Sequence, residues 1–101
     1  MPKPKPKKKS AMLKGDAWFV YILRCADGSL YTGVTTDVQR RNKQHNAGTA
    51  SRYTRSRLPV RVAYQEPHAS RSLALKREWA VKAMARPEKE SLIRRAALRD
   101  Q

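Results

Sequence analysis

Residues 17–25 (AWFVYILRC) constrain the fold more than any other segment of the sequence. β-Branched and aromatic residues dominate this stretch, and such residues favour strands. Successive side chains of a strand point to opposite faces, and here both alternating sets contain apolar side chains. The two sets are Trp18, Val20 and Ile22, and Phe19, Tyr21 and Leu23. Because both faces must be covered, we predict a strand at a central position in its sheet.

A second strand is expected to run back beside the first. Asp27 and Gly28 can supply the positive φ that a tight hairpin turn requires, and residues 29–34 (SLYTGV) then form the returning strand. Glycine weakens the interior of a strand. Gly33 therefore predicts either a β-bulge or a close approach of another group to the backbone.

A helix, a loop and a third strand follow. Thr36 and Gln39 have the spacing of a capping box, which predicts a helix that continues to about residue 46 and ends at residues 47–49. Residues 50–59 form a loop that contains three arginines. Residues 60–65 (VRVAYQ) alternate between apolar and polar side chains, as a strand does.

Two further helices complete the pattern. Ser70 is expected to cap a helix over residues 72–85, and Pro87 favours the start of another that ends near residue 98. The order β-β-α-β-α-α predicts an α+β fold, with a small three-stranded antiparallel sheet flanked by three helices. The apolar residues of the helix over 72–85 include Leu75, Trp79, Ala83 and Met84.

The charge of the chain indicates a polyanionic partner. There are 23 Lys and Arg residues against 8 Asp and Glu in 101 residues, so the formal net charge is +15. Such an excess favours nucleic acid as the partner, because each neutralised phosphate releases counterions. The alternative is a charge that serves only to keep the protein in solution. Residues 1–14 are rich in lysine and proline, so we expect a disordered basic arm there. Residues 15–101 are expected to form one domain.

Several classes of protein and of site are excluded. Cys25 is the sole cysteine, which rules out an internal disulfide and a cysteine-built zinc site; this residue and His68 are given no functional role. No apolar run reaches the roughly 20 residues of a membrane span, and no apolar stretch follows the basic N-terminus as in a signal peptide. We therefore expect a cytoplasmic protein without a membrane partner.

Three sequence features occur in order along the predicted elements. Val20-Tyr21 lies in the first strand, Tyr31-Thr32-Gly33 lies in the second, and the helix that follows carries Arg40-Arg41 and His45. This set resembles the GIY-YIG nuclease superfamily, and in particular its small stand-alone bacterial branch. The resemblance covers roughly residues 17–94.

The resemblance implies a site and a chemistry. It places catalytic roles on Tyr21, Tyr31 and Arg41, with His45 one helical turn beyond, and metal binding on Glu78. It also implies one divalent ion, Mg²⁺ or Mn²⁺, which accepts a single carboxylate together with waters and phosphate oxygens. A tyrosine can act as general base, and a guanidinium can hold phosphate oxygens. Gly33 is structural.

Each assignment has a structural alternative. The tyrosines could pack in the sheet, Arg41 could be a solvated helix charge, and His45 could make a polar contact at the helix end. Glu78 could simply pair with Lys82 at i+4. The first motif lacks its glycine, and no asparagine follows Asn46, although many relatives have one near the C-terminus. The residues expected to contact the nucleic-acid backbone are Arg40, Lys43, Arg52, Arg55 and Arg57.

We therefore expect a metal-dependent endonuclease that cleaves DNA with little sequence specificity, in DNA repair or processing. A partner protein is a candidate source of targeting. The alternatives are a non-catalytic nucleic-acid-binding module with the same fold and a basic RNA-binding protein. The net charge supports the endonuclease and the non-catalytic module equally. Nicking of a plasmid separates these two hypotheses, because only the endonuclease cleaves DNA.

Overall fold

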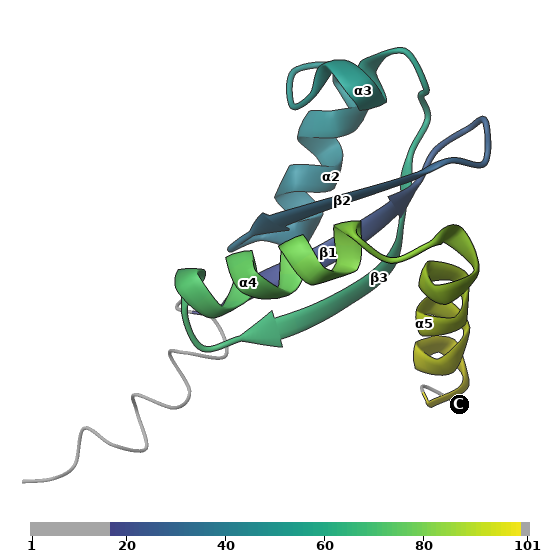
Figure 1. Ribbon diagram of the computed structural model, residues 1–101. Coiled ribbons are helices and arrows are strands. Elements are labelled where there is room, and N and C mark those ends of the chain that lie inside the picture. Colours follow the sequence, from purple (N-terminus) through teal and green to yellow (C-terminus); the bar gives the residue numbers. More distant parts are fainter. Residues whose placement is uncertain (1–16, 100–101) are drawn as a thin grey trace, which may run out of the picture.

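Three antiparallel strands with helices on both faces form the architecture of this computed structural model, which describes residues 17–99 (Figure 1). The strands lie in the order β2-β1-β3. The α+β class and the central position of the first strand are therefore confirmed, and the predicted basic arm of residues 1–14 lies outside the described residues. The strands are β1 (Trp18–Arg24), β2 (Leu30–Thr35) and β3 (Arg61–His68).

The apolar faces of β1 are covered by different helices, which Figure 1 shows on opposite sides of the sheet. On one face, α2 packs over a buried cluster that includes Tyr21 and Val38. On the other face, α4 and α5 cover a cluster that includes Val20, Ala74 and Val81. None of the helices within residues 17–99 is long and apolar enough to span a membrane. The helices are α2 (Val38–Asn46), α3 (Arg52–Arg55), α4 (Arg71–Lys82) and α5 (Arg86–Arg99).

The ends of several elements differ from the sequence prediction. Gly28 adopts φ 87°, as the predicted hairpin turn requires. The first helix, however, is capped by Asp37, whose side chain accepts a hydrogen bond from the amide of Arg40 at 3.0 Å. The prediction that Thr36 caps this helix was wrong, because an aspartate one residue later satisfies the same free amides.

The segment between α2 and β3 is more ordered than a loop. Residues 52–55 form α3, whose N-cap is Ser51. A helix of four residues is too short to show a hydrophobic period, so the sequence pattern did not reveal it. β3 continues to His68, beyond the predicted end at residue 65, and includes Pro67. Proline is tolerated there because β3 is an edge strand.

The residues that α4 buries fully are not the apolar residues named from the sequence, such as Leu75 and Trp79. Its cap is Ser70, as predicted. The side chains that it buries fully are Ala74 and Val81, which lie two turns apart, whereas Trp79 is 73% exposed. Small residues fit this position because α4 packs directly against β1 and β2.

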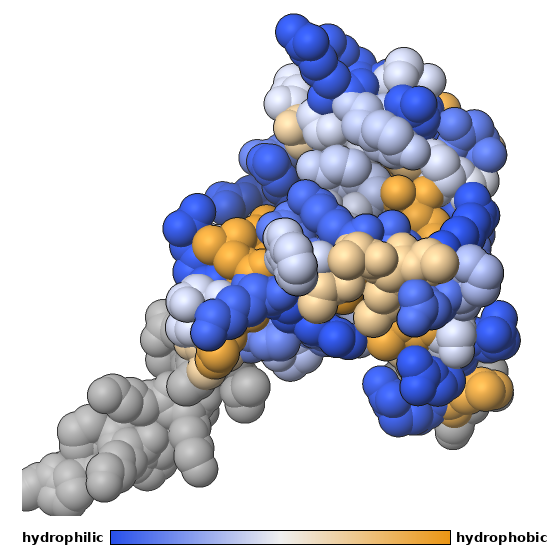
Figure 2. Space-filling view, in the orientation of Figure 1, coloured by the Kyte–Doolittle hydropathy of each residue, from blue (hydrophilic) through white to orange (hydrophobic). Residues whose placement is uncertain are grey.

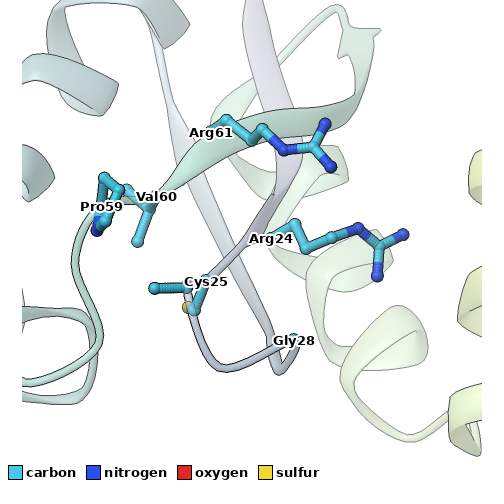
Figure 3. A pocket seen from close by; sticks show the side chains of 7 residues that line it. Arg24, Cys25, Gly28, Pro59, Val60 and Arg61 are labelled. Carbon is cyan, nitrogen blue, oxygen red and sulfur yellow. The ribbon is translucent and has the colours of Figure 1, made fainter.

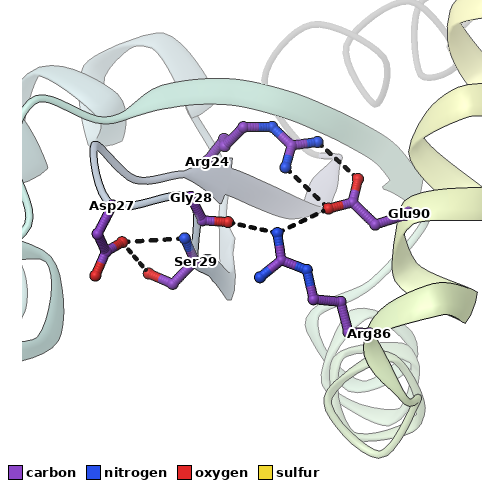
Figure 4. A network of polar contacts seen from close by, with 6 residues as sticks. All are labelled: Arg24, Asp27, Gly28, Ser29, Arg86 and Glu90. Carbon is purple, nitrogen blue, oxygen red and sulfur yellow. Dashed lines mark hydrogen bonds and ion pairs between the residues drawn. The ribbon is translucent and has the colours of Figure 1, made fainter.

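Charged side chains connect α5 to the turn between β1 and β2 (Figure 4). Arg24 donates two hydrogen bonds to the Glu90 carboxylate, at 2.8 and 2.9 Å. Arg86 donates to the same carboxylate at 3.1 Å and to the carbonyl oxygen of Gly28 at 2.7 Å. A bidentate pair of this kind has a fixed geometry, so it holds α5 at one position on the sheet.

The Glu90 contacts predict a pH-dependent stability. The pKa of the Glu90 carboxyl is lowered to about 2, first by the hydrogen bonds from Arg24. The unfolded value is about 4.3, so ionised Glu90 stabilises the fold above that pH, and the contribution is lost as the pH falls towards 2. We expect Glu90→Gln to lower the urea midpoint at pH 7, and this effect to fall to roughly half at pH 3. An equal effect at both pH values would contradict the assignment, and Glu88→Gln on the same helix is the control.

Candidate functional site

The ring of Tyr21 crosses the backbone of the neighbouring strand at Gly33. The two residues are directly opposite in the β1–β2 register, and Tyr21 is 2% exposed. A Cβ atom placed on Gly33 would lie 2.6 Å from the Tyr21 hydroxyl oxygen. The predicted close approach at Gly33 is therefore confirmed, whereas the bulge in the sheet lies between Ile22 and Leu23 of β1, where that strand pairs with β3.

A buried chain of hydrogen bonds begins at the Tyr21 hydroxyl. Its oxygen lies 2.9 Å from Nε2 of His45, and Nδ1 of His45 lies 2.8 Å from Oγ1 of Thr54. Both His45 and Thr54 are 0% exposed. The chain links β1, α2 and α3, so His45, near the end of α2, makes a polar contact with Thr54 and also contacts the tyrosine.

The contacts of the Thr54 hydroxyl favour one arrangement of the protons in this chain. The Thr54 hydroxyl donates to the carbonyl oxygen of Ser51 at 3.4 Å, so its oxygen is free to accept from Nδ1–H of His45. Nε2 is then the unprotonated nitrogen, and it accepts the hydrogen bond that the Tyr21 hydroxyl donates. The histidine is therefore held as a neutral acceptor behind the phenol.

Burial dominates the titration of both groups. Desolvation, together with a smaller effect of the positive charge of Arg41, lowers the pKa of His45 to about 4, so the ring is neutral at pH 7. The pKa of Tyr21 is raised to about 12, and desolvation is the largest cause. Arg41 acts against this increase, whereas Tyr31 and Glu78 add to it. Three of the residues implied by the resemblance therefore lie near the Tyr21 hydroxyl.

Tyr31 is held by aromatic neighbours. Its ring centroid lies 5.0 Å from that of His45 and 6.4 Å from that of Tyr21. On α3, Tyr53 stacks with it at 6.0 Å, and the guanidinium of Arg57 lies 3.8 Å from the centre of the Tyr53 ring. These contacts restrict the Tyr31 ring beside the hydrogen-bonded chain. Tyr53 and Thr54 were not predicted, because their link to the site depends on tertiary structure.

Arg41 and Glu78 belong to helices on opposite faces of the sheet, and both affect the pKa of Tyr21. This is feasible because β2 is an edge strand. Arg41 of α2 donates to Gln44 at 2.9 Å. Glu78 of α4 keeps only 18% of its side-chain surface exposed and pairs with Lys82 at 3.1 Å. The i+4 pair predicted as the structural alternative is thus present, and the carboxylate still lies close enough to Tyr21 to affect its pKa.

The oxygen donors near Tyr21 fit a hard divalent cation that keeps most of its water. Within residues 17–99, no three His, Cys, Asp or Glu side chains lie together as a metal cage. A Mg²⁺ ion needs no such cage, because one carboxylate, waters and phosphate oxygens complete its octahedron. Glu78 supplies that type of carboxylate, and its pair with Lys82 would have to open to admit the ion.

A hollow of about 260 Å³ adjoins Tyr31. Its walls come from β2, α3, α4 and α5, so it lies where several elements of both faces meet. It combines an apolar side chain, two tyrosine rings and two ammonium groups, which suits a ligand with flat apolar parts and negative charges. The lining residues are Leu30, Tyr31, Thr32, Tyr53, Lys82 and Lys89.

The basic residues predicted to contact the nucleic-acid backbone fall into two groups. Arg40 and Lys43 on α2, and Arg52 and Arg55 on α3, are exposed. Arg57 differs, because it pairs with Asp27 at 3.2 Å, donates to the carbonyl oxygen of Tyr53 at 2.8 Å and covers the Tyr53 ring. The Arg57 side chain is therefore already engaged by the protein.

Cys25 and His68 take no part in the hydrogen-bonded chain that begins at Tyr21, although Cys25 belongs to the same apolar core cluster. Cys25 is buried and borders a separate hollow of about 430 Å³ between the ends of β1 and β3, in which the side chains of Arg24 and Arg61 extend in the same direction (Figure 3). His68 lies at the end of β3 and contacts Glu66 at 2.7 Å. Neither residue joins the site, and His68 lies within β3, beyond the strand end predicted at residue 65.

Comparison with protein families identifies this arrangement. The family model described as the GIY-YIG catalytic domain matches residues 17–91. A UPF0213 protein of Desulfotalea psychrophila is 51% identical over 79 residues, covering 77% of this chain and 72% of that protein. A UPF0213 protein of Halobacterium salinarum is 49% identical over 73 residues, covering 72% and 95%.

Two solved structures are also similar. The UPF0213 protein BH0048 of Bacillus halodurans, solved by solution NMR, is 45% identical, covers 76% of this chain and 82% of its own, and has a TM-score of 0.50. The NMR structure of protein EF2693 from E. faecalis is 39% identical, covers 81% and 88%, and has a TM-score of 0.56.

The contact between Tyr21 and Gly33 generates a prediction. We expect Gly33→Ala to displace the Tyr21 ring and to lower the free energy of unfolding by about 1–3 kcal/mol, because the added methyl group overlaps a buried, hydrogen-bonded ring. In a Tyr21→Leu background, the same substitution should cost much less, because the distal ring atoms are gone. Urea denaturation of the four proteins measures this coupling. Equal costs in both backgrounds would show that the ring is not the obstacle.

Proposed function

Because the chain belongs to the GIY-YIG family, in the group of small UPF0213 proteins, we propose that it is a metal-dependent endonuclease. The family implies a nuclease acting on nucleic acid. The proposed substrate is DNA, cleaved with little sequence specificity in repair or processing. The observation that supports the proposal is the environment of the Tyr21 hydroxyl: its pKa is affected by Arg41, Tyr31 and Glu78, and the Tyr31 ring centroid lies 6.4 Å from that of Tyr21.

Arg41 is the proposed ligand of the scissile phosphate. Hydrolysis of a phosphodiester builds negative charge on the oxygens around phosphorus, and fixed positive groups stabilise it. A guanidinium offers several donors in one plane and can hold two oxygens at once. Its side chain lies close to both Tyr21 and His45, so a phosphate held there would be next to the buried chain of hydrogen bonds.

Tyr21 is the proposed proton carrier, with His45 behind it. A pKa of about 12 means that ionising the phenol at pH 7 costs roughly 7 kcal/mol, so a standing phenolate is not the resting state. The hydroxyl can instead accept a proton from the attacking water while its own proton moves to Nε2 of His45. Anionic phosphate beside Arg41 would favour this transfer, because it offsets the charge that lowers the pKa of His45. Tyr31 is the alternative proton acceptor.

Glu78 is the proposed ligand of one Mg²⁺ or Mn²⁺. When bound, the ion would neutralise charge on the phosphate and assist departure of the leaving oxygen. The exposed basic residues of α2 and α3 would hold the flanking backbone without reading its sequence. Binding should therefore weaken as salt rises. Cytoplasmic location, and a partner protein that supplies targeting, also belong to this proposal.

A non-catalytic binding module with the same fold is the second candidate. Two observations favour it: the sequence has no asparagine after Asn46, and Glu78 is paired with Lys82. The charge of +15 suits this candidate equally well, so only an activity measurement separates the two.

The proposal predicts nicking of supercoiled plasmid in the presence of Mg²⁺ or Mn²⁺. We expect Arg41→Ala and Glu78→Gln each to reduce the rate by at least about 100-fold, because each removes a charged group that acts in the transition state, and EDTA to abolish nicking. Arg94→Ala and Glu88→Gln change exposed residues of the same types on α5 and should nick at the normal rate.

The controls give each outcome a meaning. Plasmid binding without nicking, under all metal conditions, would favour the non-catalytic candidate. Nicking that survives in Arg41→Ala and Glu78→Gln would contradict the assigned site. Nicking that EDTA does not affect would contradict the metal dependence.

A further inference from the structure

Trp79 has an unusually exposed ring for so large an apolar side chain. Its exposed fraction of 73% is the highest among the large apolar side chains described. The residues that α4 buries fully are Ala74 and Val81, so Trp79 lies on the outer side of this helix. Within residues 17–99, its indole has no aromatic partner and no guanidinium over its face. The flat face of the ring is therefore available to a ligand.

The surroundings of Trp79 are positively charged. Lys76 and Lys82 lie three residues before and after it, one on each side along the helix surface, and both are exposed. Figure 2 shows this face of the molecule, where pale and orange residues over α4 are bordered by blue, hydrophilic ones. A flat ring between two ammonium groups suits a ligand with aromatic rings and phosphates, that is, a nucleic-acid strand.

The helix connects this ring to the proposed site. Trp79 follows Glu78 directly, and Lys82 both pairs with Glu78 and lines the hollow beside Tyr31. A strand that passes through the hollow, with a phosphate near Lys82, would therefore bring an adjacent base to Trp79.

Tyr53, the other exposed aromatic ring near the site, is less available. It is 37% exposed, stacks with Tyr31 and lies under the guanidinium of Arg57. Its ring is thus engaged by the protein, whereas the ring of Trp79 is the more exposed of the two.

We propose that Trp79 is a stacking platform for an unpaired base, so that the protein prefers single-stranded or branched nucleic acid to continuous duplex. A paired base is already stacked between its neighbours in the duplex, whereas an unpaired base exposes its ring. The ammonium groups of Lys76 and Lys82 on both sides of Trp79, of which Lys82 is also paired with Glu78, favour nucleic acid over a protein partner as its ligand. This inference rests on the proposed function, because it takes the surface beside Tyr31 as the nucleic-acid site.

Binding without turnover tests the inference. The full chain is titrated in EDTA with a fluorescent 20-residue oligo(dT) and with a fully paired duplex of equal length. We expect Trp79→Ala to weaken binding to oligo(dT) by about tenfold and to the duplex by less than twofold. Trp79→Phe should retain most of the affinity for oligo(dT). Leu73→Ala, which removes another exposed apolar side chain from α4, is the matched control. In a Trp18→Phe variant, oligo(dT) should quench the fluorescence of Trp79, and the duplex should not.

The outcomes for this inference and for the proposed function differ. Unchanged affinity of Trp79→Ala for oligo(dT), or an equal loss for oligo(dT) and duplex, would overturn the platform even if the protein nicks plasmid. A selective loss for oligo(dT) in a protein that nicks nothing would support the platform and refute the endonuclease.

Discussion

The hydrogen bond between the Tyr21 hydroxyl and Nε2 of His45 is the interaction on which the site depends. It joins the central strand to α2, and Thr54 extends it to α3. Because all three groups are buried, removing one partner would leave a polar atom unsatisfied, which costs about 1–3 kcal/mol. The chain therefore stabilises the fold, and it also fixes the position and protonation of the phenol that the proposed chemistry uses.

The strand order places the Tyr21 ring beside an edge strand of the sheet. β2 lies at the edge, and Gly33 leaves room for the Tyr21 ring to cross it. α2 covers one face and α4 the other, so Arg41 and Glu78, which both affect the pKa of Tyr21, belong to helices on opposite faces of the sheet. Cation and carboxylate have opposite effects on the pKa of Tyr21. A phosphate bound to Arg41 would add negative charge beside the cation, and a divalent ion bound to Glu78 would add positive charge beside the carboxylate.

The sequence predicted features that repeat along the chain or follow from local geometry, and it missed those that depend on packing. Apolar residues on both faces identified the central strand, and Gly33 indicated a close approach without naming its partner. Thr36 and Asp37 can both cap a helix, and only the path of the backbone decides between them. Thr54 has no local signal, because its partner comes from another helix. Trp79 fits an apolar pattern, yet α4 packs so closely on the sheet that smaller residues face the core.

The protonation state of His45 tests the account most directly. In the ¹⁵N-labelled protein, long-range ¹H–¹⁵N correlation spectra report which ring nitrogen carries the proton, and a His68→Asn variant assigns the signals. We predict a neutral ring protonated on Nδ1 and unprotonated on Nε2 from pH 7 down to pH 5, because burial lowers its pKa to about 4 and Thr54 accepts from Nδ1. A doubly protonated ring at pH 7, or a proton on Nε2 alone, would contradict a chain in which the Tyr21 hydroxyl donates to His45.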